Sequence, residues 1–564
     1  MFKKCRFLLV ILLAFAMLFG SVFAGCQSTP NIETPPGTQE PGDGDNDQDQ
    51  DNDNDDNNEE EEGRIRLAGV FESLDTGSIR PAGWLYDEMR LMLENATLSA
   101  EDIFPELSPE TSWESMSGRT FQGQGYYLRG MVPFAYAMDS APLKEKAQFW
   151  IEKLFDEQQE NGDFGPDPAD WDQLYWWNRM LFLQAVRSYY EATKDERAFE
   201  FIDRFFRFQL QELESRPLNG WGQTRVGDNL NTVIWFYTIS GEEYLLELAD
   251  TLYEYAADFL EVFDADEYYS NDCSLSSVDN NYYIPMHGVN IAQSIKTAAV
   301  YYQLSKSPQD YERYFIYRAQ QDEHFGNATG MLSGSEPLMD KSSIQPTELC
   351  SVVERLLAAG ESHIILGDAS IGDEAERIAF NALTACFSDD YCLHSYYHMP
   401  NQAISRVGHA MYVTDYDAST VPSVVSGMPC CRYNQHAGWI SFLNFLYAKS
   451  EDGVAVLAYS PSEVTTKAGG AELKLTQQTN YPFEDSVKFT FSLSEKAVFP
   501  FLMRIPAWAI GVSVQVNGTA YTGAEAGSYF EIDREWQDGD VVEIVFEREV
   551  VTEARVNGSV SVSY

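Results

Sequence analysis

The sequence predicts a mainly α-helical domain that is followed by an antiparallel β-sandwich. In the first region apolar residues recur with the period of an amphipathic helix, as Phe199, Ile202 and Phe206 illustrate. In the second region apolar and polar residues alternate, which is the period of a half-buried strand. The change of period predicts a helical domain at residues 64–450 and a sheet domain at residues 451–564.

Polar turns with capping residues recur along the helical region, near Asp195, Gly241 and Gly372. Each turn separates two amphipathic segments and therefore predicts a pair of antiparallel helices. Many such pairs in one domain indicate a ring of paired helices, an (α/α) barrel or toroid. In the sheet region, the dipeptide Asn517-Gly518 follows alternating valines and predicts a tight β-hairpin.

The first residues have the pattern of an export signal. Residues 1–25 combine a basic start with a short apolar run, and Cys26 follows Ala24-Gly25 as in a bacterial lipobox. Lipidation of Cys26 would anchor the protein to the extracellular face of the bacterial cell membrane; a plain secretory signal is the alternative. Residues 26–63 are rich in Asp, Asn, Glu and Pro and predict a disordered acidic tether.

Composition narrows the possible partners. The formal net charge is −50, which argues against nucleic acid and against an anionic substrate. Aromatic residues make up 14% of the chain, and in an exported acidic protein they favour stacking on sugars. We therefore expect an oligo- or polysaccharide partner and a membrane link through the lipid anchor only. The sequence does not indicate an oligomeric state.

Three cysteines and a carboxylate have the residue types of a zinc site. Glu348 and Cys350 flank the start of a predicted helix, for which Thr347 is a candidate N-cap, and Cys430-Cys431 follow a proline in a predicted loop. Three thiolates and one carboxylate complete a tetrahedral zinc site. The alternatives are a vicinal disulfide, other pairings, or unrelated buried residues.

The remaining chemical candidates are weaker on their own. Glu336 lies in a polar turn, where catalytic acids and solvated surface acids both occur. His287 is either a functional or a structural histidine. Cys273, Cys386 and Cys392 lack the spacing of metal ligands and are expected to be core residues or to form one disulfide.

Several short stretches together resemble glycoside hydrolase family 127, the β-L-arabinofuranosidase-like retaining enzymes. They are residues 78–84, 125–128, 176–180, 287–293, 348–354, 401–402, 430–431 with Trp439, and 504–508. The resemblance implies an (α/α)6 barrel followed by β-sandwich domains. It also implies further strands beyond Tyr564, so that the sandwich is expected to be truncated.

The resemblance also implies roles for individual residues. Zn²⁺ would be held by Glu348, Cys350, Cys430 and Cys431, with Cys430 also the nucleophile. Glu336 falls on the general acid/base of the family.

For the sugar itself, the expected contacts are His287, Trp176, Tyr397 and Gln402. The implied reaction is exo-acting hydrolysis of plant-type glycans through a covalent thioglycosyl intermediate. Two other functions stay open at this level. One is a non-catalytic carbohydrate-binding lipoprotein in which zinc is structural. The other is an (α/α)-barrel polysaccharide lyase, against which the acidic composition argues.

Overall fold

The computed structural model describes residues 64–113, 116–166, 174–259, 284–403, 405–408, 416 and 418–564. The predicted signal, the lipidation site Cys26, the tether and Cys273 lie outside these residues. Within the described ranges, no helix is both long enough and apolar enough to span a membrane.

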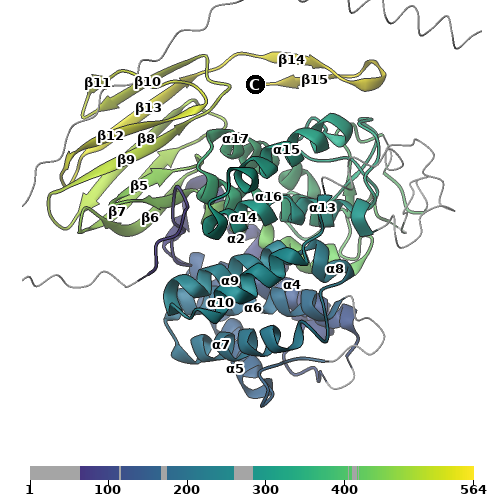
Figure 1. Cartoon of the computed structure of the whole chain (residues 1–564). Coiled ribbons are helices and arrows are strands. Elements are labelled where there is room, and N and C mark those ends of the chain that lie inside the picture. The colour runs from purple at the N-terminus through teal and green to yellow at the C-terminus, as the bar shows by residue number, and fades with distance from the viewer. Residues whose placement is uncertain are drawn as a thin grey trace, which may run out of the picture. The chain divides into compact units, whose positions relative to one another are not determined.

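Helices dominate the chain up to residue 444 (Figure 1). The α-helices are α2 (Gly83–Met92), α3 (Ala100–Ile103), α4 (Gly118–Ala137), α5 (Ala141–Glu157), α6 (Tyr175–Thr193), α7 (Glu196–Glu212), α8 (Gly220–Thr224), α9 (Val226–Ser240), α10 (Tyr244–Glu254), α13 (Gly288–Ser294), α14 (Thr297–Ser305), α15 (Pro308–Phe325), α16 (Leu349–Leu366), α17 (Ala369–Arg377), α18 (Pro429–Asn434) and α19 (Gly438–Asn444). Shorter π- and 3-10-helical turns are η1 (Leu93–Thr97), η2 (Pro105–Leu107), η5 (Ile378–Leu383), η6 (Thr384–Cys386) and η7 (Gln435–Ala437).

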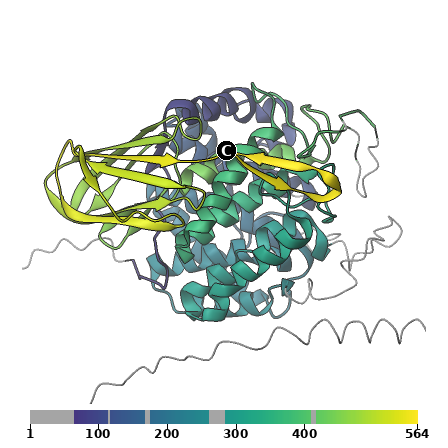
Figure 2. The same ribbon diagram turned by 90° about the horizontal axis from the view of Figure 1, so that it is seen from above.

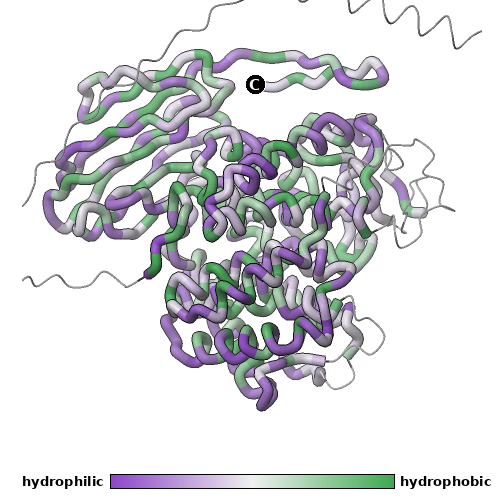
Figure 3. Tube along the Cα trace, viewed as in Figure 1, coloured by the Kyte–Doolittle hydropathy of each residue, from purple (hydrophilic) through white to green (hydrophobic). Residues whose placement is uncertain are grey.

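The helices fall into two groups by burial. Helices α4, α6, α9 and α16 are buried on nearly every side, whereas α5, α7, α10 and α17 bury one apolar stripe. Helix α7 has such a stripe, with buried phenylalanines between exposed charged residues. In Figure 3 the traces of the helices change between hydrophobic and hydrophilic colours along their length. A helix that is buried all round must lie inside other helices, so the first group forms an inner ring and the second an outer ring.

The inner ring closes on itself. Its helices contact one another in the order α4, α6, α9, α14, α16 and α19, and α19 returns to α4. Each is paired with an outer neighbour: α4 with α5, α6 with α7, α9 with α10, α14 with α15, and α16 with α17. Helix α2 packs on α19 through Trp84 and Trp439, whose ring centroids are 6.0 Å apart. The predicted (α/α)6 barrel is confirmed.

Two of the three predicted helix turns are in place. Asp195 is the N-cap of α7, where its carboxylate accepts a hydrogen bond from the Arg197 amide at 3.0 Å. Gly241 ends α9 in the left-handed conformation, with φ of 68°.

The third predicted turn, at Gly372, is wrong. Gly372 lies inside α17, and the turn is at Gly367, which has φ of 67° and precedes the N-cap Asp368. Glycine at position 372 has a packing role instead. A Cβ there would lie 2.5 Å from the side chain of Arg504, which reaches α17 from the sheet domain.

Beyond α19 the chain forms β-sheets (Figures 1 and 2). The strands are β1 (Ile79–Pro81), β2 (Thr347–Glu348), β3 (Tyr397–His398), β4 (Tyr447–Ser450), β5 (Gly453–Val456), β6 (Ser462–Ala468), β7 (Ala471–Thr479), β8 (Ser486–Leu493), β9 (Ala497–Ile505), β10 (Gly511–Val516), β11 (Thr519–Tyr521), β12 (Ser528–Trp536), β13 (Val541–Glu547), β14 (Val551–Ala554) and β15 (Val560–Ser563). One sheet has the order β1-β6-β7-β8-β13-β10-β11 and the other the order β12-β9-β5-β4. Two further pairs are β14 with β15 and β2 with β3.

The sheet domain largely follows the sequence expectation. Asn517 and Gly518 form the predicted hairpin between β10 and β11, both with positive φ. Strand pairing departs from expectation in one place, because β5 and β9 run parallel. The boundary is also less sharp than residue 451, since β4 begins at Tyr447 and β1 adds to β6 from the N-terminal side.

Buried charges join the barrel to the sheet domain. Arg504 of β9 is fully buried, and its Nη2 lies 2.5 Å from the Glu376 carboxylate of α17. Tyr481 donates a hydrogen bond to the same carboxylate at 2.7 Å. Because the buried Arg504 guanidinium also bonds Asp373 of α17, these contacts hold α17, and with it the adjoining α16, in place.

Candidate active site

Four ligand-type atoms converge where α16 and α18 begin. The carboxylate of Glu348 and the sulfurs of Cys350, Cys430 and Cys431 all lie within 4.8 Å of one another. Both helices start at this point, so their first-turn amides and dipoles favour negative charge here.

Glu348 and Cys350 share this site because the backbone changes conformation between them. Glu348 is the last residue of β2 and has extended dihedral angles, φ −78° and ψ 137°, whereas Cys350 lies in the first turn of α16. The N-cap of α16 is Glu348, so the expectation that Thr347 caps this helix is wrong. Thr347 is held in β2 instead, where its hydroxyl donates to the Leu332 carbonyl at 3.0 Å.

Cys430 and Cys431 lie in a helix, and the expectation of a loop is wrong. Pro429 occupies the first position of α18, where its missing N–H costs nothing, and both cysteines fall in the first turn. The cysteines in the described part of the chain are all free thiols: Cys350, Cys386, Cys392, Cys430 and Cys431. Neither a vicinal disulfide nor a Cys386–Cys392 disulfide is therefore present.

The spacing of these atoms suits a tetrahedral ion. Oε1 of Glu348 lies 3.6 Å from Cys430 Sγ and 3.5 Å from Cys431 Sγ. An ion that holds oxygen at about 2.0 Å and sulfur at about 2.3 Å in tetrahedral geometry separates the two by about 3.5 Å. The second carboxylate oxygen, Oε2, is buried and has no hydrogen-bond partner among the described residues. The four residues therefore fit zinc.

Electrostatics single out one sulfur. Hydrogen bonds from the thiols of Cys350 and Cys431 hold the pKa of Cys430 well below its usual range. Burial raises the pKa of Cys350, of Cys431 and of Glu348 well above their ordinary values. The protein's own groups thus favour ionisation of Cys430 first, and ionising the remaining ligands requires a positive charge between them.

Glu336 faces the cluster from a strained turn. Its side chain is 4% exposed, its φ is 70°, and its backbone carbonyl accepts a hydrogen bond from the Gly288 amide at 2.6 Å. Its Oε1 accepts a hydrogen bond from the Tyr396 hydroxyl at 2.6 Å. A left-handed backbone at a glutamate is costly, so surrounding contacts must impose it, as they often do at functional sites.

Tyr396 lies between Glu336 and Cys430. Its hydroxyl oxygen is also 3.9 Å from Cys430 Sγ, so the sulfur and Oε1 of Glu336 are at most about 6.5 Å apart. Burial raises the pKa of Tyr396 well above its ordinary value, which keeps its hydroxyl protonated. Sequence reasoning missed this residue.

His287 lies beside the same carboxylates. One of its ring nitrogens is within 4.8 Å of Glu336 and Glu348 oxygens. Its Nδ1 accepts a hydrogen bond from the Val289 amide at 3.2 Å, so the neutral ring carries its proton on Nε2. Burial lowers the pKa of His287 to about 3, and the histidine therefore stays neutral over the ordinary pH range.

The other three expected sugar contacts lie elsewhere. Trp176 is buried in the barrel, where its indole N–H donates to the Arg216 carbonyl at 2.8 Å. Tyr397 pairs with Glu348 through β3 and β2, and its neighbour Tyr396 faces the cluster instead. Gln402 is exposed and accepts a hydrogen bond from the Met399 amide at 3.1 Å. Among the described residues that line the active-site cavity, none of these three is present.

The active-site cavity has a volume of about 50 Å³ above the cluster. Besides the residues already placed, its wall contains two arginines and further aromatic side chains that no sequence motif indicated. They are Arg119, Arg225, Tyr126, Trp221 and Tyr416. Aromatic faces beside polar donors suit a sugar, because its C–H faces stack while its hydroxyls hydrogen-bond.

Comparison with known proteins agrees with this architecture. The sequence model described as "Beta-L-arabinofuranosidase, GH127 catalytic domain" matches residues 85–443, and that of the "GH127 middle domain" matches residues 453–548. A comparison with curated proteins finds no match to this sequence.

Solved structures share the fold at low identity. One described as a glycoside hydrolase is 17% identical with a TM-score of 0.64, over 87% of this chain and 81% of that chain. A GH127 β-L-arabinofuranosidase from Geobacillus stearothermophilus T6 is 17% identical with a TM-score of 0.63, over 86% and 85%. A third, described as a GH127 β-arabinofuranosidase, is 15% identical with a TM-score of 0.62, over 88% and 85%.

Barrel, sheet domain and family match together define a glycoside hydrolase. The catalytic-domain match alone spans more than half of the sequence. The chain belongs to glycoside hydrolase family 127, and the resemblance noted in the sequence is confirmed.

Proposed function

We propose that this enzyme is an exo-acting, retaining hydrolase of the β-L-arabinofuranosidase type, which removes sugars from plant-type glycans with Cys430 as nucleophile and Glu336 as acid/base. The observation that carries the proposal is the Tyr396 hydroxyl, which lies 2.6 Å from the Glu336 carboxylate and 3.9 Å from Cys430 Sγ. A nucleophile and an acid at this spacing suit the two faces of one anomeric carbon.

In the first step the Cys430 thiolate attacks the anomeric carbon. The carbon–sulfur bond forms as the bond to the leaving oxygen breaks, and that oxygen takes a proton from the Glu336 carboxyl group. The depressed pKa of Cys430 supplies the thiolate, and the reaction requires that Glu336 carry a proton in the resting enzyme.

In the second step the Glu336 carboxylate removes a proton from water. The water oxygen bonds to the anomeric carbon, the carbon–sulfur bond breaks, and the Cys430 thiolate is restored, so configuration is retained. Tyr396 donates its hydroxyl hydrogen to whichever partner is ionised, the carboxylate or the thiolate. His287 offers its Nε2–H to a sugar hydroxyl from the same wall.

A zinc ion would be held by Glu348, Cys350, Cys430 and Cys431. When bound, it would keep the sulfurs ionised and protected from oxidation. We further propose that the protein works outside the cell, anchored through Cys26. This location rests on the signal and lipobox pattern of the sequence.

Metal analysis tests the ligand set. We expect one zinc per chain in the purified protein, and loss of most of it in Glu348→Gln and Cys350→Ser. Cys386→Ser is the matched control, because Cys386 is equally buried but contacts His398 at 3.2 Å rather than the cluster. Equal zinc content in all four proteins would contradict the assignment.

Activity is measured on a panel of p-nitrophenyl glycosides that includes the β-L-arabinofuranoside, with zinc and a reductant present. We expect release of p-nitrophenol from at least one glycoside, with a product of retained configuration by NMR. An inverted product would rule out the cysteine mechanism.

A further inference from the structure

Arg225 is a buried cation in the wall of the active-site cavity. It lies between α8 and α9 and is 2% exposed. Its Nε donates to Asn290 Oδ1 at 2.7 Å, and its Nη1 donates to the Tyr126 hydroxyl at 2.8 Å. Both acceptors are neutral. The third nitrogen, Nη2, donates to no atom of the described residues.

The other buried arginines of the described chain are each paired with a carboxylate. Arg129 bonds Glu354 at 3.0 Å, Arg179 bonds Asp163 at 2.6 Å, Arg355 bonds Glu374 at 2.6 Å, and Arg504 lies 2.5 Å from Glu376. Arg225 has no such partner within 4 Å in the described residues. A buried charge without a counter-charge is costly, so this exception calls for a function.

We infer that Arg225 binds a carboxylate carried by the sugar in the active-site cavity, so that the enzyme prefers the glycoside of an acidic sugar. This inference deepens the proposed glycosidase function and rests on it. It names the chemical class of the substrate, a uronic-acid type of sugar, which the family match does not specify.

The surroundings of Arg225 suit a carboxylate in particular. The guanidinium lies 4.5 Å from the ring centroids of both Trp177 and Trp221, which limit its movement. Trp221 in turn contacts the His287 ring edge-to-face at 5.0 Å, so the arginine and the histidine belong to one wall. A fixed guanidinium whose Nη2 has no hydrogen-bond partner among the described residues keeps N–H donors for the oxygens of a bound anion.

The overall charge of −50 does not exclude this substrate. Residues 26–63 hold 14 of the 88 acidic residues, so most of the negative charge lies in the described domain; charges separated by more than about 10 Å are nevertheless screened by salt at ordinary ionic strength. Inside the cavity the nearest charges decide: Arg225 and Arg119 are the cations of its described wall, which Glu336, Glu348 and Cys430 also line.

A competing role for Arg225 is to balance the negative charge of the cysteine cluster. The two roles differ in what the arginine's removal changes. A counter-charge affects zinc retention and the binding of every ligand equally, whereas a carboxylate contact affects only acidic ligands.

The test measures binding by calorimetry to the zinc-loaded full-length protein. The probes are D-glucuronate, D-galacturonate and L-iduronate, each paired with its methyl ester, which keeps every hydroxyl but removes the charge. The proteins are wild type, Arg225→Gln and Arg225→Lys. Arg207→Gln is the matched control, because Arg207 is an exposed arginine on α7 that pairs with Asp203 and Glu242.

We expect at least one acid to bind wild type and the control about tenfold or more tightly than its ester. The ratio should fall below about twofold in Arg225→Gln and partly recover in Arg225→Lys, with zinc content unchanged. No preference for any acid, a preference that survives in Arg225→Gln, or loss of zinc from that variant would each overturn the inference.

The two proposals fail in distinguishable ways. Cleavage of the neutral arabinofuranoside with no preference for acids keeps the proposed function and removes the role of Arg225. Tight, Arg225-dependent binding of an acid without cleavage of any glycoside keeps the role of Arg225 and removes the proposed mechanism.

Discussion

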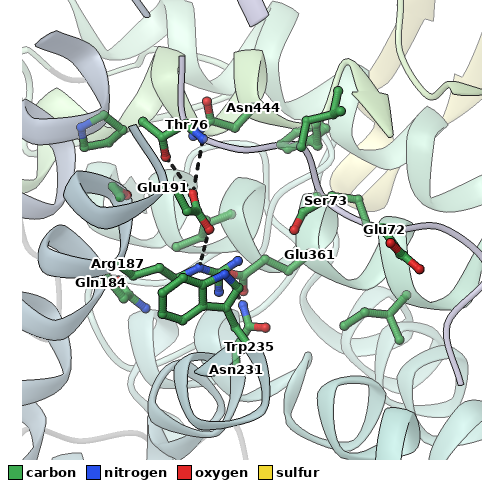
Figure 4. Close-up of a pocket in the computed structure, with 18 of the residues that line it drawn as sticks. Glu72, Ser73, Thr76, Gln184, Arg187, Glu191, Asn231, Trp235, Glu361 and Asn444 are labelled. Atoms are coloured by element: carbon green, nitrogen blue, oxygen red, sulfur yellow. Dashed lines mark hydrogen bonds and ion pairs between the residues drawn. The ribbon is translucent and has the colours of Figure 1, made fainter. Parts of the chain in front are cut away.

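Two cavities of the barrel differ in size and in chemistry. The large cavity, of about 220 Å³, lies between residues 64–76 and the inner helices α6, α9, α16 and α19 (Figure 4). The active-site cavity, of about 50 Å³, lies over the starts of α16 and α18. On volume alone the large cavity is the better candidate for a binding site.

The charges of the large cavity are internally paired. Glu191 accepts hydrogen bonds from the Thr76 hydroxyl at 2.7 Å and from Arg187 Nε at 2.9 Å, and Figure 4 shows these groups facing one another. Glu361 is likewise bonded by Asn231 at 2.7 Å and by Lys296 at 2.5 Å. These groups tie the N-terminal segment to the barrel and have little capacity left for a ligand.

The charges of the active-site cavity are segregated. Glu348, Cys430 and Cys431 crowd together on one side, and Arg225 stands on the wall without a carboxylate. A cation among the sulfurs and the carboxylate, and an anion beside Arg225, would complete the charge pairing. The comparison teaches that incomplete charge pairing marks the reactive site better than volume does.

Loss of the nucleophile should have the largest effect. In Cys430→Ser we expect kcat on the best aryl glycoside to fall by at least about 10³-fold, because a serine hydroxyl is not ionised here. Zinc retention should fall about as it does in Cys350→Ser, because each variant keeps three of the four ligands, so kcat is measured with zinc added. Asn231→Ala in the large cavity is the control and should change kcat by less than about twofold. Full activity in Cys430→Ser would contradict the mechanism.

Loss of Glu336, the proposed acid, should have the second largest effect on activity. Glu336→Gln should lower kcat by about 10²- to 10⁴-fold for a p-nitrophenyl glycoside, because the leaving oxygen is no longer protonated. The bond-breaking step should be less affected with a 2,4-dinitrophenyl leaving group, which needs little protonation. Presteady-state release of the phenol measures this step. Equal losses with both leaving groups would show that Glu336 is not the acid.

Low pH should lower the free energy of unfolding, because three buried histidines lie near the active-site cavity. Burial lowers the pKa of His394 and His398 to about 4 and that of His436 to about 3, whereas an unfolded histidine titrates near 6.5. The unfolded state therefore binds protons that the folded state does not, and stability falls as pH drops below about 6.5 until the folded pKa is reached. Each histidine should contribute about 1.4 kcal/mol per pH unit in that window.

Urea unfolding between pH 7 and pH 5 measures this slope. In His436→Asn the slope of the unfolding free energy against pH should be smaller by about 1.4 kcal/mol per pH unit, which is the contribution of one proton. The same slope in both proteins would mean that His436 is protonated in the folded state. The described lining of the large cavity contains no histidine, so changes there should leave the slope unaltered.

The smallest effect is expected in the large cavity. Glu191→Gln removes the charge that pairs with Arg187 and should lower the free energy of unfolding by about 1–2 kcal/mol. Catalytic constants should not change. Loss of activity without loss of stability would assign the large cavity a part in catalysis. It would contradict the conclusion that incomplete charge pairing, rather than volume, identifies the reactive cavity.

The sequence predicted the barrel and the metal-type residues because both depend on local signals. Helical periodicity specifies each helix, and the Glu-x-Cys and Cys-Cys motifs carry their chemistry in the residue types themselves. Glu348 and Cys350 face one point because a strand ends and a helix begins between them, which a capping pattern indicates.

What the sequence could not predict depends on tertiary contacts. Tyr396 and Tyr397 are neighbours that point to opposite sides of a short strand, and only the pairing of β3 with β2 decides which faces the cluster. Arg225 has no motif, and its isolation from carboxylates is visible only in the folded cavity. Gly372 was mistaken for a turn because its reason, the close approach of Arg504, lies in another domain.

The most direct test of the account is to trap the covalent intermediate. The enzyme is mixed with a slow aryl glycoside of the sugar that it cleaves, quenched in acid, digested and examined by mass spectrometry. The account predicts a sugar adduct on the sulfur of Cys430 and none on Glu336. An adduct on Glu336, or steady turnover with no adduct on any residue, would contradict it.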